Sequence, residues 1–148
     1  MTDDELSELH RRLGEMIVWA GRLEFMIAGL TAKVASVPPH GEEAGRSVTT
    51  NIRYLRDASV TRDGKTLMNE CLIAFERRNQ YVHGTWIGSK LDGTTPLVTV
   101  RPAKPPRKGQ RQEKGKIGMV SAEDLGELTM EFVRLTNAVG VHALDVEP

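Results

Sequence analysis

Apolar residues recur at alternating steps of three and four along the first quarter of the chain. This spacing places them on one side of an α-helix, and we expect one long helix from about residue 3 to about residue 36. Pro38-Pro39 would end it, because proline cannot continue a helix. Ile17, Phe25 and Met26 widen the stripe, which predicts contact with more than one neighbouring helix. The stripe itself consists of Leu6, Leu9, Leu13, Met16, Ala20, Leu23, Ile27, Leu30 and Val34.

Two more helices are expected before Gly84. The second runs from about residue 42 to about residue 58, and a turn follows at Asp63-Gly64. The third runs from about residue 65 to His83, and Gly84 is a natural terminator. The inward positions are Val48, Ile52 and Leu55 in the second helix, and Leu67, Met68, Cys71, Leu72, Phe75 and Val82 in the third.

The pattern changes after Gly84 to short β-like runs. We expect strands at 85–87, 97–100 and 117–120, with turn chemistry at Asp92-Gly93. Ser121 then begins a last helix that extends to about Leu144, because it is a good N-cap followed by acidic residues. The apolar positions of this helix are Leu125, Leu128, Phe132, Leu135 and Val139.

These elements predict an all-α fold: a four-helix up-and-down bundle with a small β-meander inserted before the last helix. We expect one domain over residues 1–148, with the meander at about 85–120. Two long striped helices exceed what a compact monomer of this size easily covers, so a homodimer is expected. A tightly packed monomer is the alternative.

Composition narrows the class of protein. The chain has 148 residues, 39% of them hydrophobic and only 5% aromatic, so its core must be largely aliphatic. Acidic and basic residues balance at 20 each, so net charge alone indicates no nucleic-acid partner. The single cysteine, Cys71, excludes a disulfide framework and suits a small buried hydrophobe. With no secretory signal and no membrane-length apolar run, we expect a cytoplasmic protein that does not contact a membrane.

Polar residues interrupt the inward stripe of the third helix near its end. Cys71, Phe75, Asn79 and His83 are each four apart, and Arg78 lies on the neighbouring apolar line. A cation on a core-facing line is costly unless it is paired or lies at the edge of a cleft. One interpretation is therefore structural: Arg78 pairs with a carboxylate such as Glu24, and His83 stabilises the C-terminus of the helix, where a cationic side chain is favoured.

The second interpretation is chemical. Arg78-Asn79-Gln80-Tyr81-Val82-His83 resembles the signature of the HEPN superfamily, which is Arg, a polar residue that is often Asn, three further residues and His. The long first helix with Trp19 and Glu24, and the Gly84-x-Trp86 exit into a meander, are also similar to members of that superfamily. The resemblance implies a helical-bundle endoribonuclease that needs no metal and joins the motifs of two subunits at a dimer interface. It also implies a toxin or defence effector, with an antitoxin protein as a candidate partner.

Carried over by position, the resemblance makes His83 the general base for the ribose 2′-hydroxyl. Arg78 would hold the scissile phosphate, and Asn79 would orient the imidazole or the phosphate. These roles suit the groups, since imidazole titrates near neutral pH and guanidinium binds phosphate through two hydrogen bonds. The chain departs from some HEPN toxins at Thr85, where they carry Tyr. Arg77 offers an alternative pairing with His83, but Asn follows Arg78 directly.

A basic segment rich in Pro and Gly lies between the last two expected strands. It could follow an RNA backbone through phosphate contacts, or it could be a solvated mobile loop. Together with Arg77, its cations are the predicted RNA-binding residues: Arg101, Lys104, Arg107, Lys108, Arg111, Lys114 and Lys116. The other histidines, His10, His40 and His142, have no metal-ligand spacing, so no metal or cofactor is expected. The alternatives to a ribonuclease are a dimer that binds RNA, a nucleotide or a protein without cleavage, and a purely structural bundle.

Overall fold

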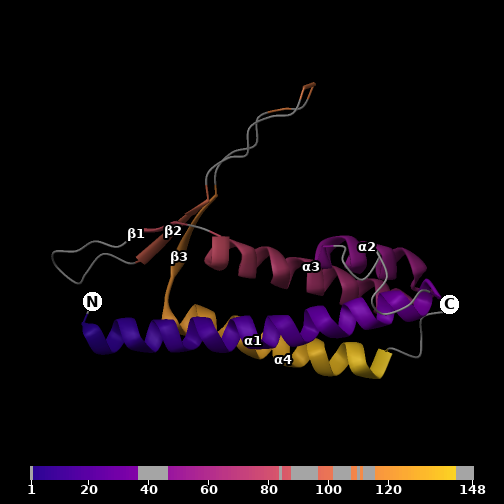
Figure 1. Cartoon of the computed structure of the whole chain (residues 1–148), viewed down its shortest axis with the longest axis horizontal. Coiled ribbons are helices and arrows are strands. Elements are labelled where there is room, and N and C mark those ends of the chain that lie inside the picture. The colour runs from indigo at the N-terminus through magenta and orange to yellow at the C-terminus, as the bar shows by residue number, and fades with distance from the viewer. Residues whose placement is uncertain are drawn as a thin grey trace.

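The computed structural model describes residues 2–36, 47–83, 85–87, 97–101, 108–109, 111 and 116–142; for His142 and every strand residue except Val120, only the backbone is described. This part of the chain forms four helices and three short strands (Figure 1). The predicted all-α bundle with a meander before the last helix is confirmed.

Helix α1 (Asp3–Val34) is the long helix that the apolar spacing predicts. Thr2 caps it, because its hydroxyl accepts from the N–H of Glu5 while the Glu5 carboxylate accepts from the N–H of Thr2. Ser36 follows the helix with a left-handed φ of 55°, a conformation common just beyond a helix end. Met26 packs against the core as expected, but Ile17 and Phe25 stay 41% and 80% exposed. Within one chain, the widened part of the stripe is therefore not covered by the described residues.

Helices α2 (Val48–Ala58) and α3 (Arg62–His83) form the next pair. Ser47 caps α2, and the expected start near residue 42 lies outside the described residues. Helix α3 begins before the turn that Asp63-Gly64 predicts, so that prediction is wrong. The Thr61 hydroxyl accepts from the N–H of Gly64, which caps the first turn of the helix there. A Cβ at Gly64 would lie 3.1 Å from the Thr61 Oγ1, so the site favours glycine.

The meander consists of strands β1 (Thr85–Ile87), β2 (Leu97–Arg101) and β3 (Lys116–Val120), paired antiparallel in the order β1-β2-β3. Helix α4 (Ala122–His142) follows at once. Ser121 caps it as expected, since its hydroxyl accepts from the N–H of Asp124 at 3.0 Å. The two residues predicted to extend α4 to Leu144 lie outside the described residues.

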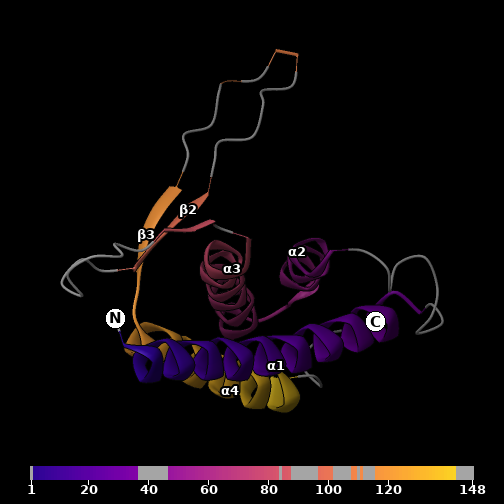
Figure 2. The same ribbon diagram turned by 60° about the vertical axis from the view of Figure 1, so that its left-hand side comes forward.

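The helices form two layers, with α1 and α4 side by side and α3 and α2 packed over them (Figure 2). Helices α1 and α4 run in the same direction: Arg12 lies beside Gly126, and Met26 beside Gly140. The strict alternation of an up-and-down bundle therefore does not hold for this pair. The meander that joins α3 to α4 explains this. It starts α4 at the end of the molecule where α3 stops, so α4 runs opposite to α3 (Figure 1).

The core lies where these layers meet. Phe75 of α3 and Phe132 of α4 contact edge to face, with ring centroids 5.2 Å apart, and both are fully buried. Cys71 is buried beside them in α3, and burial raises the pKa of its thiol to about 12, which suits a small buried hydrophobe. Among the described helices, none combines the length and the apolarity that a membrane crossing needs.

Candidate nucleic-acid site at the end of helix α3

The last three turns of α3 lead from the core to the surface. Cys71 and Phe75 are fully buried, Asn79 is half-buried, and His83, the final residue, is exposed. These four residues lie on one line of the helix because they are four apart. The motif therefore lies at the point where α3 leaves the bundle, and its imidazole is open to solvent.

Arg78 is half-buried and has no carboxylate partner among the described residues. Its Nη1 donates to the Oδ1 of Asn79 at 2.9 Å, and its guanidinium carbon lies 6.0 Å from the centre of the Phe75 ring. Its Nε is buried without an acceptor in the described part of the chain. The expected alternative, an ion pair with Glu24, is not formed. The positive charge of Arg78 therefore lies at the surface of the core, and no carboxylate of the described residues neutralises it.

Arg78 and His83 do not share a helix face. Five residues rotate a helix by about 140°, whereas Asn79 lies on the same line as His83. Asn79 is therefore the link between the two groups, since it binds Arg78 through its side chain and precedes His83 by one turn. A ligand that contacts both charged groups has to lie at the helix end, where a long Arg side chain and an exposed imidazole can both reach.

Arg77 belongs to a different surface. It is exposed and lines a hollow of about 330 Å³ together with Glu70, Glu127 and Glu131. These carboxylates surround Arg77, so the predicted phosphate contact at Arg77, and its alternative pairing with His83, gain no support. This environment depends on α4 and could not be foreseen from the sequence of α3.

The predicted basic segment begins and ends on the meander at the same end of the bundle as the motif (Figure 1). Arg101 and Lys116 are register partners at the ends of β2 and β3, and both strands pack against α3. Lys108 and Arg111 are exposed. Three of the predicted RNA-binding residues lie outside the described residues: Lys104, Arg107 and Lys114.

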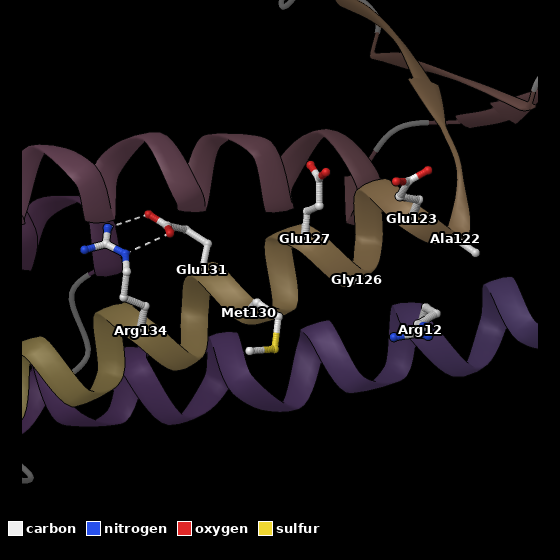
Figure 3. A pocket seen from close by; sticks show the side chains of 8 residues that line it. All are labelled: Arg12, Ala122, Glu123, Gly126, Glu127, Met130, Glu131 and Arg134. Atoms are coloured by element: carbon white, nitrogen blue, oxygen red, sulfur yellow. Dashed lines mark hydrogen bonds and ion pairs between the residues drawn. The ribbon is translucent and has the colours of Figure 1, made fainter.

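A larger hollow of about 850 Å³, which sequence reasoning missed, lies along α4 beside α1 (Figure 3). Glu123, Glu127 and Glu131 line it at steps of four, a spacing that could have revealed it. Arg134 pairs with Glu131 at 2.6 Å and Glu70 at 3.1 Å, and this guanidinium holds the pKa of Glu131 below its usual value. Arg12 also lines the hollow and donates to Glu8, so the lining carries three carboxylates against two guanidiniums, an acidic balance that does not suit a nucleic-acid backbone.

The described residues contain no group of three or more His, Cys, Asp or Glu side chains that could hold a metal ion. Comparison with known proteins identifies no relative, because no family model, no curated protein and no solved structure matches the chain. The site at the end of α3 therefore has to be interpreted from its own geometry.

Proposed function

We propose that the protein is a metal-independent, HEPN-like endoribonuclease whose active groups are Arg78, Asn79 and His83. The observation that supports this most is the state of Arg78: a half-buried guanidinium that donates to a neutral amide and has no carboxylate partner among the described residues. A buried or half-buried cation is usually paired. A phosphate bound at the helix end would supply the missing negative charge.

The proposed reaction uses groups of the chain and of RNA only. His83 takes the proton of a ribose 2′-hydroxyl, and the oxygen attacks the adjacent phosphorus. The bond from phosphorus to the 5′-oxygen breaks, leaving a 2′,3′-cyclic phosphate and a 5′-hydroxyl end. Arg78 binds the phosphate oxygens and stabilises their added charge. In the proposed homodimer, His83 of the second copy protonates the leaving oxygen, and an antitoxin protein would restrain the activity.

The test is cleavage of a mixed single-stranded RNA in the presence of EDTA. We expect the wild type to cut, and His83→Ala and Arg78→Ala each to lower the rate by at least about 100-fold, the scale of general acid–base catalysis. Arg77→Ala is the matched control, because this neighbouring exposed arginine faces carboxylates, and it should retain activity. Circular dichroism confirms that each variant folds. Unchanged cleavage by His83→Ala would reject the proposal.

One observation favours a second candidate, RNA binding without cleavage. His83 is exposed, and no described residue hydrogen-bonds its ring to hold it in one orientation. A protein of this kind would leave RNA intact yet retard it in a gel, and added salt would weaken the complex. The same RNA, run before and after incubation, distinguishes cutting from binding.

A further inference from the structure

The strands of the meander bring the end of the motif and two cationic residues to the same end of the sheet. Because β1, β2 and β3 are antiparallel neighbours in that order, the chain enters β1 at the end where it leaves β2 and enters β3. It enters β1 two residues after His83, leaves β2 at Arg101 and enters β3 at Lys116. We call Arg101 and Lys116 the cation pair. The register therefore places the cation pair at the end of the sheet where α3 ends (Figures 1 and 2).

The register also limits how far the cation pair lies from the motif. Thr85 is the partner of Val100, the residue before Arg101. With about 3.8 Å between consecutive Cα atoms and about 5.5 Å between register partners, the Cα atoms of His83 and Arg101 are at most about 17 Å apart. A stacked strand advances about 3.4 Å per nucleotide, so an RNA strand of a few nucleotides covers this distance.

The two charges of the cation pair are unfavourable neighbours in the protein alone. Arg101 and Lys116 are register partners, so they occupy directly opposite positions on one face of the sheet. Like charges at directly opposite positions destabilise an antiparallel pair of strands. The three strands contain no acidic residue that could neutralise them. An anion bound at these two positions would replace the repulsion with attraction.

We propose that the cation pair is a second phosphate subsite, which holds a neighbouring phosphate of the RNA strand whose scissile phosphate binds Arg78. This inference rests on the proposed function, because it takes Arg78 as the first subsite. The motif acts on the scissile phosphate, and the cation pair fixes the position of the strand through its backbone, without reading its bases. The substrate is therefore an RNA strand that carries more than one phosphate, and a dinucleotide with a single phosphate is too short to occupy both subsites.

The first experiment measures affinity for 2′-O-methyl oligonucleotides, which lack the free hydroxyl that cleavage needs. A dinucleotide carries one phosphate, whereas a hexanucleotide can reach both subsites. We expect the double variant Arg101→Gln with Lys116→Gln to bind the hexanucleotide at least about tenfold more weakly than the wild type, and to change dinucleotide binding less than about twofold. Competition against a labelled longer strand gives both affinities.

The matched control removes two positive charges at the other end of α3. Arg62 and Lys65 are exposed and lie in the first turn of this helix. Arg62→Gln with Lys65→Gln should leave hexanucleotide affinity within about twofold of the wild type. Circular dichroism shows whether each variant folds. The inference is overturned if the wild type binds both lengths equally, or if the loss at the cation pair is the same for both lengths.

These affinities separate the inference from the proposed function, because neither oligonucleotide can be cut. If His83→Ala cuts ordinary RNA as the wild type does, the proposed function fails, yet the two affinities still test the second subsite. If cleavage depends on His83 while the cation pair leaves hexanucleotide affinity unchanged, only the second subsite fails.

A second experiment uses the repulsion within the cation pair. Arg101→Glu places opposite charges at the two positions, so we expect the melting temperature without RNA to rise while hexanucleotide affinity falls. A residue with a purely structural role would not separate these two measurements in this way. High salt should reduce the gain in melting temperature. A lower melting temperature than that of the wild type, or an unchanged affinity, overturns the inference.

Discussion

The guanidinium of Arg78 donates a hydrogen bond to the side-chain oxygen of Asn79, its immediate neighbour, at 2.9 Å. A neutral amide orients the cation but does not neutralise it. The centre of the Phe75 ring lies 6.0 Å from the guanidinium carbon. Asn79 therefore contacts the Arg78 guanidinium through a neutral group, and under the proposed function it would hold this cation without competing with a phosphate.

The amide of Asn79 provides the first prediction. Asn79→Asp places a carboxylate beside Arg78, and the two side chains should form an ion pair. We expect RNA affinity to fall at least about tenfold, because this carboxylate competes with the RNA phosphate for Arg78. The measurement is RNA affinity by gel retardation at fixed salt. Asn69→Asp is the control, since Asn69 accepts from Arg56 at the exposed surface, away from the motif. Equal loss in both variants would show that the effect is merely added negative charge.

The cations of the segment between β2 and β3 provide the second prediction. Removing Lys108 and Arg111 together should lower the slope of log affinity against log salt by about 1.4 if both contact the phosphates of single-stranded RNA. Both residues are exposed. The measurement is a salt titration of RNA binding, with Arg53→Ala on α2 as the control. An unchanged slope would remove these two residues from the RNA contact.

The contact between Phe75 and Phe132 provides the third prediction. Phe132→Ala should lower the free energy of unfolding by about 3–5 kcal/mol, because it opens a cavity in a fully buried position. Phe132→Leu retains most of the volume and should cost less. Urea unfolding measures both. Ile73→Ala is the control, because Ile73 is exposed, and its effect should stay within about 0.5 kcal/mol.

The ion pairs at the start of α1 provide the fourth prediction. Arg11 and Arg12 donate to Glu8, which lowers the pKa of that carboxyl to about 2 from its ordinary 4.5. A lowered pKa in the folded state stabilises the fold above pH 4.5, and this contribution is lost as the pH falls towards 2. Glu8→Gln should therefore flatten the fall of the melting temperature between pH 5 and pH 2.

The size of this pH effect should be small, because Glu8 and its arginines are exposed to solvent. High salt should reduce the difference between Glu8→Gln and the wild type. Glu127→Gln is the control, since the structure describes no ion pair for Glu127. If the melting temperatures of the wild type and Glu8→Gln change identically with pH at low salt, the lowered pKa of Glu8 does not contribute to stability.

Most of the local structure could be predicted because its causes are local. The spacing of Leu9, Met16 and Leu23 defines one side of a helix wherever that helix packs, and Ser121 caps α4 through an N–H only three residues away. The error at Gly64 has the same origin. Asp-Gly indicates a turn, but the Thr61 hydroxyl caps the first turn of a helix there, and glycine allows Ser59 and Thr61 to approach closely.

The position of the candidate site in the sequence could be predicted, but the contacts among its side chains could not. The order Arg78, Asn79 and His83 was evident, yet whether Arg78 meets Glu24, an amide or a ligand depends on side chains brought together by folding. Arg77 shows the same limit, since the carboxylates around it come largely from α4. The spacing of residues within α3 does not show which charged residues of another helix will lie beside it.

The amino-acid sequence by itself determined where the helices and strands lie and which side of each is apolar, because hydrogen bonds within an element and its hydrophobic period are short-range properties. Only the tertiary structure decided that α1 and α4 run in the same direction, that Arg78 binds Asn79, and that Phe25 stays exposed. These features depend on which faces meet, and that choice is made by the packing of the whole chain at once.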